Sequence, residues 1–296
     1  MRLAAVYYGA VILLIACLSS SILTRAIDKD SGLLETGSAP NINTKRAVPE
    51  EIKIVSYNMR WRGGDDLDDL IKLFKDDKEI GGATVIGLQE VDRNKRRTNG
   101  INTAKKMAEE LKMHYAWAAP PPPSGKERDE EETGVAILSP YPLTDVTRIV
   151  LPNPGPNGRR RAAIGATVRI GDRSLHVYSV HAEVRTSNEK RIGQLQAVLD
   201  DLQSHHMQLK QSVILGDFNT LVPKDINGTS KLFTEKGFQT PFSNTEPTWR
   251  TFVIELKLDW LWLRGFNVKQ FGIDRQVSMS DHWPLWVTVT TNDKKE

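Results

Sequence analysis

Cysteine is almost absent from this sequence, since Cys17 is the only one among 296 residues. A single thiol excludes an intramolecular disulfide framework and a zinc site built from cysteines. A large excess of one charge is also missing, because 40 basic residues face 37 acidic ones and the formal net charge is +3. Because the two charges are nearly balanced, the net charge does not by itself indicate a nucleic-acid-binding protein. Any affinity for phosphate has to come from local clusters of basic residues.

The chain also lacks the features of a serine hydrolase. There is no Gly-x-Ser-x-Gly turn, and no internal repeat of fixed period is visible. Ser280 stands next to Asp281 and His282, but side chains adjacent along an extended segment point to opposite faces, so these residues do not form a catalytic triad. With 39% hydrophobic and 26% charged residues, the chain has an ordinary globular composition. Its length suits one large α/β domain or two small ones.

An apolar segment stands at the amino terminus. Residues 3 to 23 carry no charged side chain, which predicts a secretory signal or a membrane anchor. Within it, the letters LIAC at 14 to 17 resemble the bacterial lipobox, in which a small residue precedes a cysteine that is lipidated and becomes the new amino terminus. We therefore predict a lipoprotein-type signal peptide over residues 1–16, lipidation of Cys17, and a location in the cell envelope, facing outside the cytoplasm. A secreted protein and a single-pass anchored protein are the alternatives.

The segment that follows is polar. Residues 18 to 48 are rich in Ser, Thr, Asn and Gly and contain few large apolar residues. Such a composition is typical of flexible chain that cannot bury enough apolar surface to fold. We predict a tether over 17–48, a folded domain over 49–291 and a polar tail over 292–296.

Within the folded domain, runs of strand length alternate with segments of helical periodicity. The segments 65–77 and 192–202 place apolar residues on one face at helical spacing, and 103–113 is also expected to be helical. About nine strands are expected, at 51–61, 83–91, 134–139, 160–170, 174–183, 212–217, 257–265, 267–273 and 283–291. Mixed strand pairs with helices between them predict two packed sheets with helices outside. The proline-rich stretch 120–132 predicts an exposed loop.

Polar side chains follow the ends of these strands. The strand 212–217 ends in Asp217, and Asn219 lies on the same face, where burial without partners would cost on the order of 2 kcal/mol or more for each. Taken singly, such a residue usually caps a turn. The whole set comprises Asn58, Glu90, His181, Asp217, Asn219, Asp259, Asp281 and His282. Gathered at one rim, these oxygen ligands and imidazoles would form a site for a divalent cation and for proton transfer.

Seven motifs, spread over residues 52 to 291, resemble those of the endonuclease/exonuclease/phosphatase superfamily: SYNMR, GLQEV, GVAILSPYPL, YSVHAE, GDFNT, LDWLW and SDHWPLW. That superfamily includes deoxyribonuclease I, abasic-site endonucleases of the exonuclease III type, neutral sphingomyelinases and inositol polyphosphate 5-phosphatases. The resemblance implies an α/β fold, namely a four-layer α/β sandwich of two mixed β-sheets flanked by helices, with the site at one end of the sheets. It also implies a divalent-metal-dependent hydrolase that cleaves a phosphate ester, most often a phosphodiester, by in-line attack of water.

The resemblance assigns the metal ligands. Glu90 matches the principal Mg²⁺ ligand, with Asn58 beside it, and Asp281 would complete the metal shell directly or through water. A hard cation prefers carboxylate and amide oxygens, and Mn²⁺ or Ca²⁺ are alternatives to Mg²⁺.

The resemblance also assigns the groups that act on the substrate. Asp217 would hold the attacking water, or a second metal as in some members, and Asn219 would donate to a phosphoryl oxygen. His282 would accept a proton or stabilise charge near the phosphate, oriented by Asp259 as a carboxylate orients an imidazole. His181 matches a residue suited to protonation of the leaving group.

The substrate stays open between a phospholipid head group, a nucleic acid and a small phosphate ester. Basic clusters at 93–97 and 158–161 would line the mouth of the site and hold phosphates, or else lie in solvated loops. We expect a monomer that reaches the membrane through its amino-terminal lipid or anchor. A nuclease, a non-catalytic binding protein that retains the fold, and an envelope protein in which the site is incidental are the rival interpretations. Because every expected metal and proton-transfer position is filled, the sequence favours an enzyme.

Overall fold

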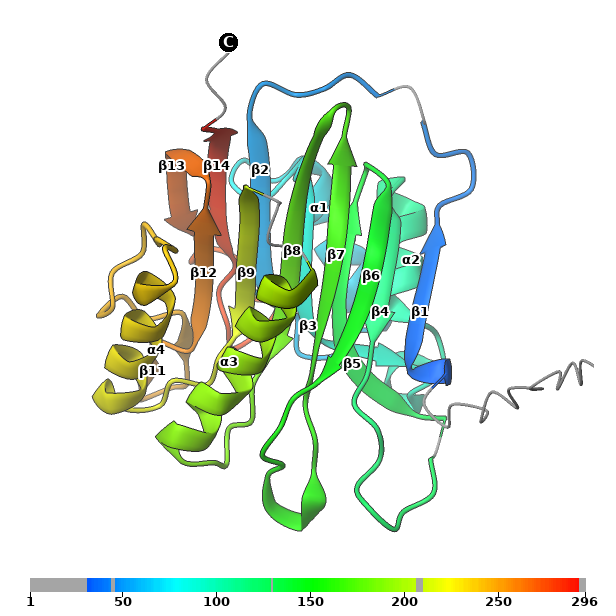
Figure 1. Cartoon of the computed structure of the whole chain (residues 1–296). Helices are drawn as coiled ribbons and strands as arrows, with labels where there is room; N and C mark the ends of the chain where they lie inside the picture. The colour runs from blue at the N-terminus through cyan, green and yellow to red at the C-terminus, as the bar shows by residue number, and fades with distance from the viewer. Residues whose placement is uncertain (1–30, 44–45, 129, 206–209, 293–296) are drawn as a thin grey trace, which may run out of the picture.

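Two β-sheets pack face to face in the centre of the structure, and helices cover the outer face of each (Figure 1). The computed structural model describes residues 31–43, 46–128, 130–205 and 210–292. This arrangement of helix layer, sheet, sheet and helix layer confirms the expected four-layer α/β sandwich.

The larger sheet has seven strands in the order β1-β4-β5-β3-β2-β14-β13, and the smaller has five in the order β12-β9-β8-β7-β6. The larger sheet consists of β1 (Leu34–Ser38), β2 (Ile52–Asn58), β3 (Val85–Arg93), β4 (His114–Ala118), β5 (Glu132–Ser139), β13 (Phe266–Ile273) and β14 (Leu285–Thr291). The smaller consists of β6 (Leu143–Val150), β7 (Ala162–Ile170), β8 (Arg173–His181), β9 (Gln211–Asp217) and β12 (Asp259–Arg264). A separate hairpin joins β10 (Trp249–Arg250) to β11 (Glu255–Leu256), and the helices are α1 (Gly64–Asp76), α2 (Thr103–Leu111), α3 (Asn188–His205) and α4 (Pro223–Glu235).

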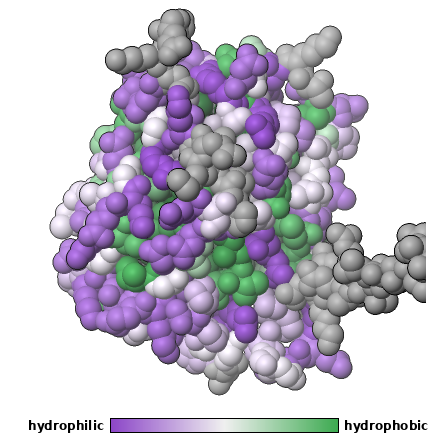
Figure 2. All heavy atoms as spheres, viewed as in Figure 1, coloured by the Kyte–Doolittle hydropathy of each residue, from purple (hydrophilic) through white to green (hydrophobic). Residues whose placement is uncertain are grey.

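Helix periodicity decides which face of each helix packs on a sheet. In α1 the four buried side chains are the apolar ones of the predicted stripe, Leu67, Leu70, Ile71 and Phe74. They join Met107 of α2 in a core on the outer face of the larger sheet. On the smaller sheet, α3 and α4 close a second core. Figure 2 shows the face of the molecule that these two helices occupy, where hydrophilic residues cover most of the surface.

Two pairs of parallel strands position the candidate site. β2 and β3 are parallel neighbours joined through α1, and β8 and β9 are parallel neighbours joined through α3. The carboxyl ends of parallel strands meet at the same edge of a sheet. His181 therefore lies opposite Asp217, and the antiparallel strand β12 begins with Asp259 opposite Asp217 on the other side.

Gly216 marks the point where β9 turns from core to site. Its φ is +134°, and a Cβ there would lie 2.0 Å from the carbonyl oxygen of Val180 on β8. Only glycine fits so close to the neighbouring backbone. The apolar run of β9 therefore stops at Gly216, immediately before Asp217.

The first strand corrects the predicted tether. Leu34–Ser38 pairs antiparallel with β4 at the edge of the larger sheet, and Leu33 is 1% exposed. Glu35 accepts hydrogen bonds from Arg93 and Tyr115. This segment has few large apolar residues, yet it is ordered because the open edge of the sheet supplies partners for its backbone. The prediction of a flexible tether up to residue 48 is therefore wrong for residues 34–38.

Several predictions fall on residues outside the described ranges. The signal peptide over 1–16, Cys17 and residues 293–296 of the polar tail are among them. None of the helices in the described part of the chain combines the length and apolar character needed to span a bilayer.

The structure also contains strands that the sequence pattern did not indicate. Besides β1, these are β4, β6 and the hairpin of β10 and β11. β6 shows no alternation of buried and exposed residues, and the two hairpin strands have two residues each. Without alternation or length, a strand has no periodic signal to find.

Candidate active site

Strand ends from both sheets bring polar side chains to one rim of the sandwich. A cavity of about 330 Å³ opens there, and six of the eight predicted site residues line it: Glu90, His181, Asp217, Asn219, Asp281 and His282. The other two, Asn58 and Asp259, lie directly behind, each in contact with one of these six. The structure therefore brings together the whole set that the sequence indicated.

Asp217 is at the centre of this group. Its carboxylate is buried and accepts hydrogen bonds from Asn58 Nδ2 at 3.1 Å and from the backbone N–H of Asn219 at 3.0 Å. His181 Nε2 and His282 Nε2 lie 3.5 and 3.9 Å from its Oδ2 atom. Burial raises the pKa of Asp217 to about 7, with the charge of His282 opposing the rise and that of Asp259 adding to it. These partners satisfy the carboxylate that ends β9.

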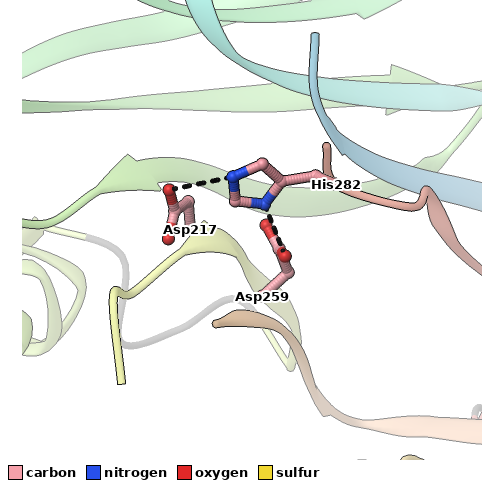
Figure 3. A group of neighbouring side chains, drawn as sticks. All are labelled: Asp217, Asp259 and His282. Carbon is pink, nitrogen blue, oxygen red and sulfur yellow. Dashed lines mark hydrogen bonds and ion pairs between the residues drawn. The ribbon is translucent and has the colours of Figure 1, made fainter. Parts of the chain in front are cut away.

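His282 and Asp259 form a buried pair (Figure 3). His282 Nδ1 lies 2.8 Å from Asp259 Oδ2, while its Nε2 points toward Asp217. Burial alone would lower the pKa of His282, but the carboxylates of Asp259 and Asp217 outweigh that effect and raise it to about 9. Asp259 is held in turn by Thr248, whose Oγ1 accepts from its backbone N–H at 2.8 Å.

His181 is in the opposite electrostatic state. Burial, followed by the positive charges of Arg161 and His282, holds the pKa of its imidazole well below the usual value. Arg161 Nη1 lies 3.3 Å from His181 Nδ1, and its guanidinium also pairs with the buried Glu183. A neutral His181 can donate one N–H but carries no additional proton, so its predicted role toward the leaving group stays a prediction.

Glu90 is the carboxylate best placed to bind a cation. It lies at a bulge of β3, where the register with β5 shifts, and its φ is 56°. Its backbone carbonyl accepts from Trp61, yet within the described residues its carboxylate makes no hydrogen bond or ion pair. The backbone of Glu90 is thus held in a left-handed conformation, and its carboxylate lines a cavity without a partner among the described residues. Both features fit a metal ligand.

The other two predicted ligands are already engaged. Asn58 Oδ1 accepts from the backbone N–H of Arg60 at 3.1 Å, and Asp281 Oδ2 pairs with Arg60 Nη1 at 3.3 Å. An amide oxygen has a second lone pair, so Asn58 can still bind a cation beside Glu90. Asp281 fits a contact through water better than a direct one, because Arg60 neutralises it. The donor set therefore fits a hard divalent ion held mainly by Glu90.

Asp217, Asp259 and His282 also lie close enough together to be considered as ligands themselves, with candidate atoms within 4.8 Å of one another. However, His282 Nδ1 and Asp259 Oδ2 are bound to each other, and only His282 Nε2 is directed toward Asp217. These two atoms are therefore already engaged with each other and are less available to a metal ion than the carboxylate of Glu90.

A second cavity continues from the first. Its volume is about 500 Å³, and it shares Trp61, Glu90, Arg161 and His181 with the site. Both predicted basic clusters line it, through Lys95 and Arg97 on one side and Arg159, Arg160 and Arg161 on the other. We call it the basic groove. The two clusters are separated by more than 60 residues in sequence, so only the fold shows that they face the same space.

Residues 55–282 match the model of the Endonuclease/Exonuclease/phosphatase family. The chain belongs to this family. The predicted family membership and fold are therefore confirmed. The family is one of phosphoesterases and nucleases.

Solved structures show the same fold at low sequence identity. An endonuclease/exonuclease/phosphatase from Bacteroides vulgatus is 17% identical with a TM-score of 0.63, covering 82% of this chain and 100% of that one. The human Nocturnin catalytic domain with bound sulfate anion is 17% identical with a TM-score of 0.62, covering 88% and 98%. ANGEL2, a 2′,3′-cyclic phosphatase, is 14% identical with a TM-score of 0.62, covering 88% and 99%. No curated protein sequence matches this chain.

A buried lysine that the sequence analysis did not single out lies near the pair of His282 and Asp259. Lys257 is 4% exposed, and its Nζ has no hydrogen-bond partner within the described residues. It stands 5.0 Å from the ring centroid of Trp260 and 5.3 Å from that of Phe242. Burial lowers the pKa of Lys257 to about 8, although the charge of Asp259 opposes the shift.

We predict that Lys257→Met stabilises the protein at pH 7. A folded-state pKa of about 8 against 10.5 in the unfolded chain means that the unfolded state binds more protons, so the stability of the wild type should rise between pH 8 and 10.5. Methionine should raise the free energy of unfolding at pH 7 by on the order of 2 kcal/mol and remove this rise. Urea titrations at pH 7 and pH 10 measure both effects. Lys269→Met, at an exposed position, is the control, and equal pH profiles for all three proteins would contradict the prediction.

Proposed function

We propose that the protein hydrolyses a phosphodiester with the help of a divalent cation bound at Glu90. The observation that carries this proposal is the buried pair of His282 and Asp259, directed toward Asp217 across a cavity that Glu90 also enters. Groups whose environments shift their pKa values in different directions are typical of acid–base sites.

The side chains divide the work of an in-line displacement by water. Asp217, with a pKa of about 7, can orient the attacking water and accept its proton. His282, with a pKa of about 9, is positively charged at neutral pH and can stabilise charge that develops on the phosphoryl oxygens. A bound Mg²⁺, Mn²⁺ or Ca²⁺ would add to that stabilisation as a Lewis acid.

Asn219 has a hydrogen free for the substrate. One amide N–H of Asn219 donates to the carbonyl oxygen of Ala182 at 3.0 Å, which fixes the side chain at the cavity wall. Since an amide NH₂ group has two hydrogens, the second can reach a phosphoryl oxygen. His181, kept neutral beside Arg161, accepts at Nδ1 and therefore has its one N–H on Nε2, which lies 3.5 Å from Asp217 Oδ2 at the cavity.

The basic groove favours a diester over a monoester. A monoester ends at its phosphate, whereas a diester carries a second substituent that needs room and contacts beyond the phosphorus. The groove adjoins the site and offers both. ANGEL2 is a 2′,3′-cyclic phosphatase, and a cyclic phosphate of this kind is a diester, which supports the same substrate class. A nuclease is the second candidate, because a basic groove also suits a nucleic-acid backbone.

We expect Glu90→Gln to abolish turnover of bis(4-nitrophenyl) phosphate, because the amide removes the charge that holds the cation. The fold should be retained, with a free energy of unfolding within about 0.5 kcal/mol of the wild type. Calorimetric titration with Mg²⁺ should show that binding is lost as well, and the exposed Glu235→Gln is the matched control. A wild-type rate at saturating Mg²⁺ would refute the assignment of Glu90.

For the histidine pair, we expect His282→Ala to lower kcat by about 10²-fold or more, because it removes a charged group that faces the phosphate. Asp259→Asn should lower kcat less, since it only weakens the orientation of the imidazole. Steady-state rates on the same soluble diester measure both, and His114→Ala, on β4 away from both cavities, is the control. If both variants keep the kcat of the wild type, the pair is structural.

We also propose that the chain is a lipid-anchored monomer of the cell envelope. The support is the LIAC sequence at 14 to 17 and the charge-free run around it. The described residues of one chain supply every side chain of the site, which is consistent with a monomer and can be checked by light scattering.

Lipid attachment gives a direct mass signature. Protein extracted from membranes of a bacterial host should begin at Cys17 and carry acyl groups, and Cys17→Ser should lose both the lipid and the cleavage. Intact-mass spectrometry measures the two species. An unmodified Cys17 in an uncleaved chain, or a mature amino terminus beyond it, would argue against this anchor.

A further inference from the structure

A hairpin at the mouth of the site exposes three consecutive apolar side chains. β10 and β11 pair as Trp249 with Leu256 and Arg250 with Glu255, which leaves residues 251–254 as the tip. Within the tip, Phe252 is 103% exposed, Val253 79% and Ile254 52%. Single exposed apolar residues are ordinary, but three consecutive ones, each more than half exposed among the described residues, are not.

The tip is held in this exposed form by its own hydrogen bonds. Thr251 N donates to the carbonyl oxygen of Ile254 at 2.8 Å, and the Oγ1 atom of Thr251 accepts from the backbone N–H groups of Val253 and Ile254 at 3.3 and 3.1 Å. The turn therefore fixes the backbone and leaves the side chains outside the fold.

The hairpin is joined directly to the catalytic segment. Trp249 forms a β-bridge with His282, and Arg250 N donates to the carbonyl oxygen of Asp281 at 2.9 Å. The side chains of Trp249 and Leu256 line the site cavity. A surface that contacts the tip would therefore lie close to His282 and to the cavity.

More apolar surface and positive charge lie around the cavity that the hairpin lines. Leu221 and Val222, at the start of α4, are 36% and 50% exposed, and Leu221 lines the same cavity. Arg250 beside the tip is exposed, and the basic groove shares Trp61, Glu90, Arg161 and His181 with the cavity. Apolar side chains next to basic ones are the combination that binds the interface of a membrane with anionic lipids.

The described chain also begins at this end. Ser31–Leu33 lies near the end of β3, where the carbonyl oxygen of Gly32 accepts from Arg93 and, at 3.1 Å, from Arg128 (Figure 1). The first described residues therefore lie at the rim that carries the site.

We infer that this rim docks on a lipid bilayer, with the tip of residues 251–254 inserted in the interface and the basic groove against anionic head groups. The active-site cavity then faces the membrane surface, and its substrate is the phosphodiester of a phospholipid head group. The identity of this substrate rests on the proposed function, whereas the docking does not.

A bilayer fits this surface better than a protein or a nucleic acid does. A stable protein interface needs about 800 Å² on each partner, far more than a three-residue tip offers. A nucleic-acid backbone would contact the basic groove but would gain nothing from Val253 and Ile254, which have no aromatic face to stack on a base.

The single cysteine of the chain allows docking to be measured without turnover. In the full-length Cys17→Ser background, Phe252→Cys is labelled with an environment-sensitive fluorophore and mixed with vesicles of phosphatidylcholine and phosphatidylglycerol. The emission should move to shorter wavelength and be quenched by doxyl-labelled lipids. The control is a label at Val48→Cys, since Val48 is 49% exposed and precedes β2 at the opposite end of the sandwich. The label at 48 should not respond.

A second measurement links docking to activity. Phe252→Ser combined with Val253→Ser should lower the rate on phospholipid vesicles by about tenfold or more, because two apolar anchors are lost. The same variant should keep the wild-type rate on bis(4-nitrophenyl) phosphate, and Val48→Ser should change neither rate.

Each result has one meaning. Loss of the vesicle rate together with an inserted label at 252 supports the proposal. Labels at 48 and 252 that respond equally, or a label at 252 that responds to a DNA oligonucleotide or to protein concentration instead of vesicles, would overturn it. A label that inserts while neither substrate is cleaved would refute the proposed function and the lipid substrate but keep the docking surface.

Discussion

The buried carboxylate of Asp217 is the group on which fold and site depend together. A charge taken out of water is tolerated only where hydrogen bonds and opposite charges surround it. Its partners come from both sheets, since Asn58 ends β2 of the larger sheet and His181 ends β8 of the smaller. A second polar link, from Gln89 Nε2 to Ser179 Oγ at 2.9 Å, joins the sheets just behind it. Packing of the two sheets is therefore what makes this charge possible.

The same burial separates the protonation states of the two imidazoles beside Asp217. The imidazole paired with Asp259 gains positive charge, while the imidazole beside Arg161 loses it, although both rings lie within 4 Å of the same carboxylate. Environment alone assigns these different states to two chemically identical side chains. Within the described part of the chain, no hydrogen bond or ion pair engages the carboxylate of Glu90, which lines the cavity where a cation would bind.

The rim that carries the site is also where ordinary rules of globular structure are broken. Glu90 and Asn219 adopt left-handed backbone conformations. Among the described residues, Lys257 is buried and its amino group makes no hydrogen bond. The hairpin tip exposes Phe252, Val253 and Ile254 to solvent. Each departure costs free energy in an isolated chain. Left-handed residues also occur elsewhere, at Lys112 and Asp145 for example, so it is the position of Glu90 and Asn219 on the cavity wall that sets them apart.

The sequence by itself determined the elements whose signal is local. Helical periodicity predicted α1 with its buried stripe, apolar runs predicted nine strands, and the polar residues at their ends, with the family motifs, predicted all eight residues of the site. These signals depend only on spacing along the chain, because period 2 and period 3.6 decide which side chains share a face. The roles of the individual residues, the metal and the substrate stay predictions.

Only the tertiary structure decided the features that depend on distant partners. β1 is ordered because β4 offers it an open edge, which no property of residues 34–38 reveals. Glu90 and Asp281 look equivalent as strand-end carboxylates, yet Arg60 pairs with Asp281, while no described residue pairs with the carboxylate of Glu90. The basic clusters meet in one groove because β3 and β7 place them there. Phe252 is exposed because the hairpin contacts the catalytic segment through Trp249 and Arg250 and not through its tip. Burial and pairing across the fold are set by which segments meet in space, and spacing along the chain does not encode that.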